Sequence, residues 1–383
     1  MIRGCFFLIN KERFINEFME LVQVDSETGA ERAICDILIE KFTSLGLHVE
    51  EDQTMEETGH GAGNLVATLE ATRDGFNPIY FTSHMDTVVP GKGVKPSIQD
   101  GFIVTDGTTI LGSDDKAGIS AMLEGIRILK EQQIHHGKIQ FLITVGEESG
   151  LKGSKAFDVK KLDAQYGFAL DSDGKVGDII VSAPTQAKIK VIIKGKAAHA
   201  GVNPEAGISA IQLASKAISR MPMGRIDKET TANIGSFQGV GPTNVVCDRV
   251  EIIAEARSIS QEKMMKQVET MEKTFIETAR EFGGDAEFYY EVMYAGFSFG
   301  EEDPVVQKAM EAVKGINRTP RLLSSGGGSD ANILAGAGIP TVNMAIGYEN
   351  IHTKKERMPI DELIKTGELV LSLCQGAIGS VEA

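Results

Sequence analysis

A continuous run of apolar residues at Ile139–Val145 is the feature that most constrains the fold of this chain. Its length and composition are typical of a strand buried on both faces, as in parallel sheets covered by helices. Strand patterns also occur at Asn64–Leu69, Pro78–Ser83 and Gly167–Leu170. The spacing of apolar residues within residues 11–45 predicts two helices. This alternation predicts an α/β fold with a mostly parallel sheet.

The pattern of elements changes near Pro184. Residues 185–297 are predicted to form strands in pairs with two helices between them, the order of an α+β, ferredoxin-like unit. Within this stretch, Asn244–Arg257 is predicted to form a hairpin-like pair of strands. Strand and helix alternate again beyond it. We therefore expect one domain made of residues 1–184 and 298–383, with the 185–297 domain inserted into it.

The composition is that of an ordinary globular protein, with 42% hydrophobic and 24% charged residues. The formal net charge of −15 argues against binding to nucleic acid or to anionic membranes, which requires clustered Lys and Arg. The longest apolar runs fall short of the ~20 residues of a membrane span. The apolar stretch Cys5–Ile9 is too short for the hydrophobic part of a signal peptide. We therefore expect a cytoplasmic protein.

The four cysteines, Cys5, Cys35, Cys247 and Cys374, lie far apart and form no CxxC pair. They are predicted to be reduced, structural thiols. A metal ion in this protein would therefore be held by His, Asp and Glu.

The predicted strand at Pro78–Ser83 ends in His84-x-Asp86. Ligands bind beyond the carboxyl ends of the strands in an α/β sheet, and residues i and i+2 of an extended chain point to the same side. His84 could therefore offer one ring nitrogen to a metal ion while Asp86 holds the other N–H. On its own, this motif also fits a strand-end turn in which Asp86 caps the backbone.

Adjacent acidic residues stand at two other element ends. Asp114 and Asp115 precede the helix predicted from Ala117, where one aspartate would suffice as an N-terminal cap. Glu147 and Glu148 follow the first apolar strand. They would repel each other in a surface turn, whereas one could ligate a metal ion while the other serves as a free base. A solvated acidic turn is the alternative for this motif alone.

Two further candidates follow predicted strands, Asp171 after Gly167–Leu170 and His352 after Thr341–Ala345. Two histidines and three carboxylates at one sheet edge, without cysteine, suit a pair of zinc-like cations. The five candidate ligands are His84, Asp114, Glu148, Asp171 and His352.

A series of motifs, in order along nearly the whole chain, resembles the metallopeptidase family of peptidase T, carboxypeptidase G and aminoacylase. These motifs are SHMDTV, LGSDDKAG, GEESG, LDSDG, AAHAG, NIGSFQGVGPTNVVCDRVEIIAEARS, SGGGSDAN and NIHTKKE. LGSDDKAG and the His-Thr-Lys-Lys-Glu end are most similar to peptidase T. The resemblance implies a zinc-peptidase-like catalytic domain and an inserted lid and dimerisation domain.

The resemblance also implies which residues hold the metal ions. His84, Asp114 and Asp171 would hold one zinc ion. Asp114, Glu148 and His352 would hold the other, with Asp114 as the bridge. A cis peptide bond between Asp114 and the following aspartate is implied as well.

Other residues are implied to act on the substrate. Asp86 would orient His84, and Glu147 would be the general base. The residues implied to bind the substrate are His199, Asn244, Arg257, Gly327 and Gly328.

The implied activity is that of an aminopeptidase which releases the N-terminal residue of tripeptides with two Zn²⁺ per subunit, replaceable by Co²⁺ or Mn²⁺. The stretch between His84 and Asp114 is shorter than in peptidase T, so tripeptide specificity need not transfer with the metal site. The same site could serve an N-acyl amino acid deacylase or a carboxypeptidase.

A homodimer through the inserted domain is a further implication. A binding protein with structural acidic strand ends is the non-enzymatic alternative, and it gives Glu147 no role.

Overall fold

The computed structural model describes residues 9–375, which form two compact units. The first comprises the described residues up to Val181, Phe299–Ser324 and those from Ser329 onward. The second comprises Ser182–Ser298 and Ser325–Gly328. The sequence predicted boundaries after residue 184 and before residue 298, and it predicted residues 325–328 in the first domain. Of the stretch Cys5–Ile9, all but Ile9 lies outside the described residues.

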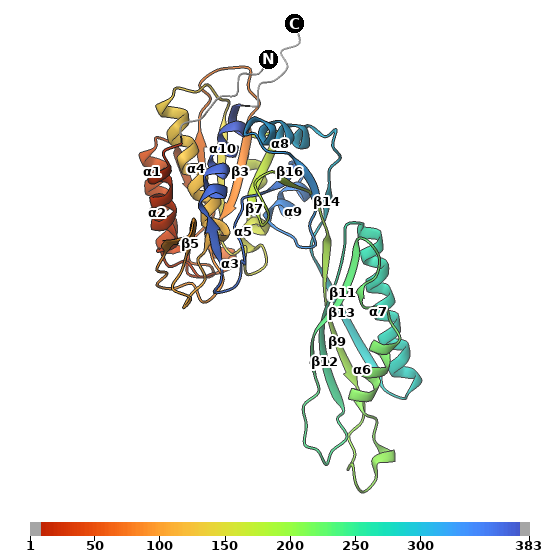
Figure 1. Cartoon of the computed structure of the whole chain (residues 1–383). Coiled ribbons are helices and arrows are strands. Elements are labelled where there is room, and N and C mark those ends of the chain that lie inside the picture. The colour runs from red at the N-terminus through yellow and green to blue at the C-terminus, as the bar shows by residue number, and fades with distance from the viewer. Residues whose placement is uncertain (1–8, 376–383) are drawn as a thin grey trace. The chain divides into compact units, whose positions relative to one another are not determined.

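The first unit is built on a nine-stranded sheet, in which β14 and the last two residues of β8 are grouped with the second unit (Figure 1). Its strands are β1 (His48–Glu51), β2 (Leu65–Leu69), β3 (Ile79–His84), β6 (Ile139–Thr144), β7 (Tyr166–Ser172), β8 (Asp178–Ala183), β14 (Phe297–Ser298), β15 (Arg321–Ser324) and β16 (Thr341–Ala345). They lie in the order β1-β2-β6-β3-β7-β16-β8-β14, and β15 pairs with β8. The central strands β6, β3, β7 and β16 are parallel, and β1, β2, β8 and β14 are antiparallel to their neighbours. The predicted α/β fold with a mostly parallel sheet is confirmed.

Helices cover both faces of this sheet. Because successive side chains of a strand point to opposite faces, Phe81 of β3 joins a core with α1, α2, α4, α8 and α10. Its neighbour Tyr80 packs with Leu334 of α9 on the other face. The helices are α1 (Lys11–Val22), α2 (Arg32–Ser44), α3 (Thr54–Thr58), α4 (Ser113–Glu131), α5 (Lys152–Ala156), α8 (Pro304–Gly315), α9 (Asp330–Gly336) and α10 (Ile360–Gln375), with a 3₁₀ turn at Val159–Lys161.

A small three-stranded sheet joins two distant segments of this unit. It consists of β4 (Ser97–Gln99), β5 (Phe102–Val104) and β17 (Arg357–Pro359), in the order β17-β5-β4. The segment between His84 and Asp114 is thereby tied to the chain that follows His352.

The second unit is a five-stranded antiparallel sheet with two main helices (Figure 1). Its elements are β9 (Thr185–Lys194), a 3₁₀ turn (Pro204–Ala206), α6 (Ala210–Ser219), β10 (Gly224–Arg225), β11 (Thr230–Gln238), β12 (Arg249–Ser258), α7 (Gln261–Glu281) and β13 (Asp285–Tyr294). The strand order is β10-β11-β12-β9-β13. Ile189 and Val191 of β9 pack with Met271 and Phe275 of α7 in its core.

The predicted hairpin at Asn244–Arg257 is wrong. The structure has one strand there, β12, which pairs with β11 and β9. The alternation of buried and partly exposed side chains begins only at Val250. Val245 and Val246 suggested a strand, but they lie in a loop that contacts the chain at Ala198 and His199.

The helices and the cysteines of residues 9–375 bear on two predictions made from the sequence. No helix in this range is long and apolar enough to cross a membrane. Its cysteines, Cys35, Cys247 and Cys374, are free. Cys5 lies outside the described residues.

Candidate active site

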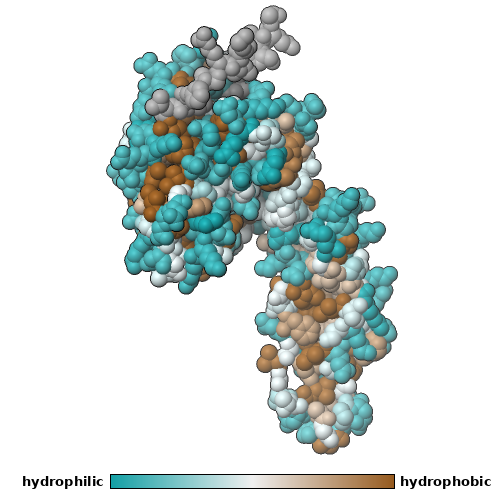
Figure 2. All heavy atoms as spheres, viewed as in Figure 1, coloured by the Kyte–Doolittle hydropathy of each residue, from teal (hydrophilic) through white to brown (hydrophobic). Residues whose placement is uncertain are grey.

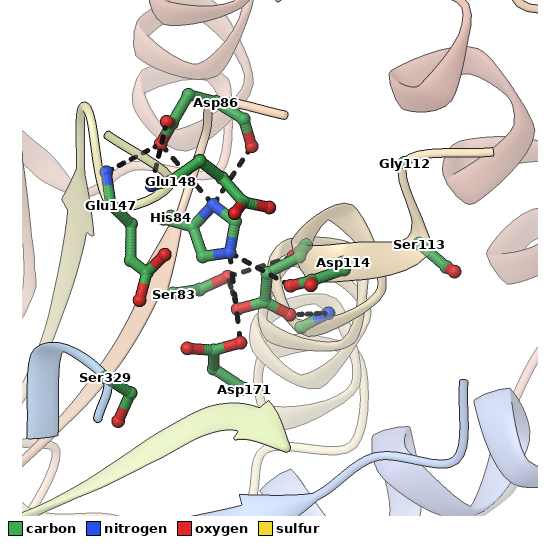
Figure 3. Close-up of polar contacts among 12 residues, drawn as sticks. Ser83, His84, Asp86, Gly112, Ser113, Asp114, Glu147, Glu148, Asp171 and Ser329 are labelled. Carbon is green, nitrogen blue, oxygen red and sulfur yellow. Dashed lines mark hydrogen bonds and ion pairs between the residues drawn. The ribbon is translucent and has the colours of Figure 1, made fainter. Parts of the chain in front are cut away.

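The parallel arrangement of β3, β6, β7 and β16 brings distant segments to one edge of the sheet. His84 ends β3, Glu147 and Glu148 follow β6, and Asp171 lies near the end of β7. The loop after β16 carries His352. Figure 3 shows the carboxylates of Asp114, Glu147, Glu148 and Asp171 gathered around the His84 ring.

His84 is buried, and both of its ring nitrogens face acidic residues (Figure 3). Nε2 lies 3.0 Å from Asp114 Oδ1 and 3.8 Å from Asp171 Oδ1. Nδ1 lies 3.0 Å from the backbone oxygen of Asp86 and 3.4 Å from its Oδ1. Burial lowers the pKa of His84, but the hydrogen bonds with Asp114 and Asp86 outweigh burial, so this pKa stands well above its usual value.

Asp114 faces two histidines with its two carboxylate oxygens. Oδ1 lies 3.0 Å from His84 Nε2, and Oδ2 lies 3.3 Å from His352 Nε2. Burial alone would raise the pKa of Asp114. The hydrogen bonds from His352 and His84 have the larger, opposite effect, so this pKa lies below its usual range. The predicted cis bond between Asp114 and Asp115 is confirmed. The helix α4 is irregular at both aspartates, where φ and ψ are not helical.

Glu148 and His352 form the second contact of this cluster. His352 Nε2 lies 3.0 Å from Glu148 Oε1. Hydrogen bonds with Asp114 and Glu148 raise the pKa of His352 to about 10. Without a metal ion, this imidazole is therefore a cation at neutral pH.

Asp171 is held by residues of β16 and the loop after it. The Tyr348 hydroxyl donates to Asp171 Oδ1 at 3.1 Å. The Asp171 backbone N–H donates to Asn343 Oδ1 at 3.0 Å, and the Asn343 side chain donates back to the Asp171 carbonyl at 2.6 Å. These bonds fix both the backbone and the carboxylate of Asp171.

Asp86 fixes the turn that carries both glutamates. Its carboxylate accepts hydrogen bonds from the backbone N–H groups of Glu147 at 3.1 Å and Glu148 at 3.2 Å. One carboxylate thus connects the ends of two neighbouring strands. The shorter contact of Asp86 with His84 comes from its backbone oxygen.

Asp86→Asn is expected to lower kcat by about 10–100-fold, since supporting contacts of this kind are worth that much at metal sites. An amide can accept only through its oxygen, so its NH₂ group would face one of the two backbone N–H groups of the turn. The readout is kcat together with the content of bound metal. Asp100→Asn, at an exposed position with a left-handed backbone that Asn tolerates, is the matched control. An unchanged kcat in Asp86→Asn would show that the turn does not depend on this carboxylate.

The cluster holds more negative charge than its histidines balance. Burial raises the pKa of Asp171 well above its usual value, and the charge of Asp114 adds to the effect. Burial raises the pKa of Glu147 in the same way, against the opposing charge of His84. Divalent cations among these groups would remove this cost. Imidazole nitrogens and carboxylate oxygens without sulfur suit Zn²⁺, Co²⁺ or Mn²⁺, so the residues fit a metal site.

Two groups of side chains offer donor atoms that all lie within 4.8 Å of one another. They are His84 with Asp114 and Glu148, and His84 with Asp115 and Asp171. The second group contains Asp115 where the resemblance implied Asp114. The Asp115 carboxylate accepts hydrogen bonds from Ser83 Oγ and Gly118 N, so it is already bonded to protein donors. The first group joins His84 with Glu148, which the resemblance assigned to different ions.

The residues implied to bind the substrate lie in the second unit. His199 pairs with Val245, and the N–H of the neighbouring Ala200 donates to the Asn244 carbonyl at 2.9 Å. His199 and Asn244 are thus close in the structure. Gly327 and Gly328 belong to the short segment that groups with this unit. A Cβ on Gly328 would lie 2.4 Å from the Tyr294 ring, so this position has no room for a side chain.

Arg257 is already paired within the second unit. Its Nε and Nη2 donate to the two carboxylate oxygens of Glu255 at 2.9 and 3.0 Å. Its Nη1 donates to the Gly326 carbonyl at 3.2 Å. A substrate carboxylate would have to share or displace these contacts.

Two residues that support the site were not anticipated from the sequence. Tyr348 bonds to Asp171, and the Glu356 carboxylate bonds to the segment that leads into Asp114. Glu356 stands inside the NIHTKKE motif, but its charge alone did not distinguish it from the exposed residues beside it.

A cluster of histidines and carboxylates at the carboxyl edge of an α/β sheet is an arrangement that suits a metal-dependent hydrolase. The model of peptidase family M20/M25/M40 matches residues 80–375, and the chain belongs to this family. The predicted membership of the metallopeptidase family that includes peptidase T is thereby confirmed.

Several proteins are similar to this chain over nearly its whole length. The aminopeptidase PepT from Bacillus cereus ATCC 10987 is 63% identical, with 96% of this chain and 99% of that chain covered and a TM-score of 0.93. A tripeptidase from Staphylococcus aureus is 50% identical, with 96% and 98% covered and a TM-score of 0.94. Peptidase T from Geobacillus sp. (strain WCH70) is 27% identical over 417 residues, which cover 95% of this chain and 98% of that protein.

Proposed function

We propose that this protein is a two-metal exopeptidase that releases the N-terminal residue of tripeptides. The observation that carries this proposal is Asp114, whose two oxygens face two different histidines at 3.0 and 3.3 Å. A carboxylate in that position can bridge two cations. The similarity to an aminopeptidase and a tripeptidase supports the choice of substrate.

His84, Asp114 and Asp171 would hold one ion, and Asp114, Glu148 and His352 the other. Zn²⁺ is the proposed metal, and Co²⁺ or Mn²⁺ suit the same donors. Bound there, the ions would polarise the scissile carbonyl and lower the pKa of a water molecule.

Glu147 is the proposed general base. It follows Glu148 in a turn fixed by Asp86, and burial raises the pKa of its carboxyl group well above the usual value. A raised pKa suits a group that takes a proton from the attacking water and returns it to the leaving amine. Asp86 would position both Glu147 and His84.

His199, Asn244, Arg257, Gly327 and Gly328 are proposed to bind the substrate. Arg257 can grip a carboxylate with two parallel hydrogen bonds, and its pairing with Glu255 shows this geometry within the chain. The backbone around Gly327 and Gly328 would line the pocket.

A homodimer through the second unit, acting in the cytoplasm, completes the proposal. Figure 2 shows apolar side chains among polar ones on the visible face of this unit. Its edge strand β13 exposes Tyr289, Tyr290 and Val292, and exposed edge strands can pair with another chain. A monomer by light scattering at assay concentrations would contradict the dimer.

The function is tested with a substrate panel before and after chelation. The panel contains a tripeptide, its dipeptide and tetrapeptide counterparts, an N-acetyl amino acid and an N-blocked peptide. Cleavage of the free-amine tripeptide that is lost on chelation and restored by Zn²⁺ is the expected result. Cleavage of only the acylated or blocked substrates would instead indicate a deacylase or carboxypeptidase.

Metal binding at pH 8 is expected to release at least about one proton, because His352 has a raised pKa of about 10 and must lose its proton to become a ligand. Titration calorimetry in buffers of different ionisation enthalpy measures this release. A binding heat that is the same in all buffers would contradict the proton release.

The stability of the metal-free protein should also depend on pH. The stabilising pairing of protonated His352 is fully present below about pH 6.5 and is lost as pH rises through about 10. The melting temperature of the metal-free protein should therefore fall over that range.

A further inference from the structure

Glu356 is a carboxylate with only 2% of its surface exposed, four residues after His352. A buried charge is costly unless hydrogen bonds compensate for it. Its neighbours Lys354 and Lys355 are exposed, so burial is specific to this one position of the motif.

Four consecutive residues donate to this carboxylate. Oε2 accepts from the backbone N–H groups of Leu111 at 2.8 Å and Gly112 at 2.9 Å. Oε1 accepts from the Ser113 hydroxyl at 2.5 Å and from the Asp114 N–H at 3.1 Å. Glu356 thus binds the backbone of the segment that ends in the bridging ligand.

These donors need a partner because the start of α4 is irregular. Gly112 has φ +76°, and the φ and ψ of Asp114 are −84° and 100°. Such a backbone does not form helical hydrogen bonds, and a buried N–H without a partner destabilises the fold. One carboxylate satisfies all of them.

The loop that carries Glu356 also carries His352. The backbones of Glu349 and Arg357 exchange hydrogen bonds of 2.9 and 3.0 Å and close the loop at its base. His352 lies inside it with φ +60°, an uncommon conformation for a residue with a side chain. The loop therefore holds Asp114 twice, by its backbone through Glu356 and by its carboxylate through His352.

We propose that Glu356 is a positioning residue that sets the place of Asp114 relative to His352. It thereby sets the affinity for the metal ion that Asp114, Glu148 and His352 are proposed to hold. The metal part of this inference rests on the proposed function. The coupling between residues 111–114 and the loop 349–357 does not depend on it.

The test compares Glu356→Gln with wild type and with Lys354→Gln, a control in the same loop whose side chain is exposed. Gln has the volume of Glu but turns one acceptor into a donor. In the metal-free protein, amide hydrogen exchange of a peptide spanning residues 110–116 is expected to accelerate by more than about tenfold. The control should exchange like wild type.

Zn²⁺ titration of the same proteins measures the metal part. Affinity for the weaker-bound ion is expected to fall by about 10–100-fold in Glu356→Gln. The absorption spectrum of the Co²⁺ form should change, and kcat should fall with KM nearly unchanged. A general loss of stability would not produce this combination.

Wild-type exchange at residues 110–116 together with wild-type affinity for both ions in Glu356→Gln would overturn the inference. Should that variant not fold, Ser113→Ala removes one of the four contacts, and a smaller change in the same direction is expected. No change in exchange or affinity in Ser113→Ala would equally overturn it. Two bound ions in wild type without any peptide cleavage would count against the proposed function and leave the exchange result to decide the role of Glu356.

Discussion

Glu147→Gln is expected to lower kcat by about 10²–10⁴-fold while two metal ions stay bound, because the amide cannot take up a proton from water. Glu147 and Asp86 are the acidic residues of the cluster that are proposed to act without holding an ion. The backbone N–H of Glu147 bonds to Asp86 and does not depend on the side chain, so the turn should persist. Glu147→Ala should behave alike.

The measurement is kcat on the tripeptide together with zinc content by elemental analysis. Glu302→Gln removes the same charge at an exposed position and should match wild type. Near-normal activity in Glu147→Gln would show that another group takes the proton. Loss of bound metal together with activity would instead make Glu147 a ligand.

Asp114→Ala is expected to abolish binding of both proposed ions, since its two oxygens face the two histidines that are proposed to hold different ions. The loss should cost several kcal/mol of transition-state stabilisation, about 10³-fold or more in kcat/KM. His352→Ala removes a ligand of only one of the two proposed ions and should leave the other ion bound.

Zinc stoichiometry after equilibration at fixed free Zn²⁺ distinguishes these outcomes. Asp173→Ala is the control, because Asp173 stands in the same acidic strand end but is exposed. Retention of one tightly held ion in Asp114→Ala would mean that Asp114 does not bridge. Asp115, whose donor atom lies within 4.8 Å of those of His84 and Asp171, would then be the candidate ligand in its place.

The strands and candidate ligands of the first unit could be predicted because their signals are local. β3 and β6 are fully buried, so the continuous apolar runs identify them. His84 is the last residue of β3, and Glu148 lies in the turn after β6. The parallel sheet then brings them together, and no knowledge of side-chain contacts is needed to expect this.

Other features could not be predicted because they depend on contacts between distant segments. Tyr348 is an ordinary aromatic residue in the sequence, and only the packing of its loop beside β7 directs its hydroxyl to Asp171. The three-residue strands β4, β5 and β17 are too short for a periodic pattern. Val245 and Val246 have the residue types of a strand, but local propensity does not reveal that they contact a loop instead.

The insertion of Ser182–Ser298 between the parts of the first unit has a consequence during synthesis. A nascent chain exposes His84, Asp114, Glu148 and Asp171 long before His352 leaves the ribosome. Domains generally fold as units during translation, so the second unit can fold while the first still lacks β16, α10 and the loop between them. Unfinished chains therefore lack one of the five candidate ligands, and a chain truncated before His352 should not hydrolyse peptides.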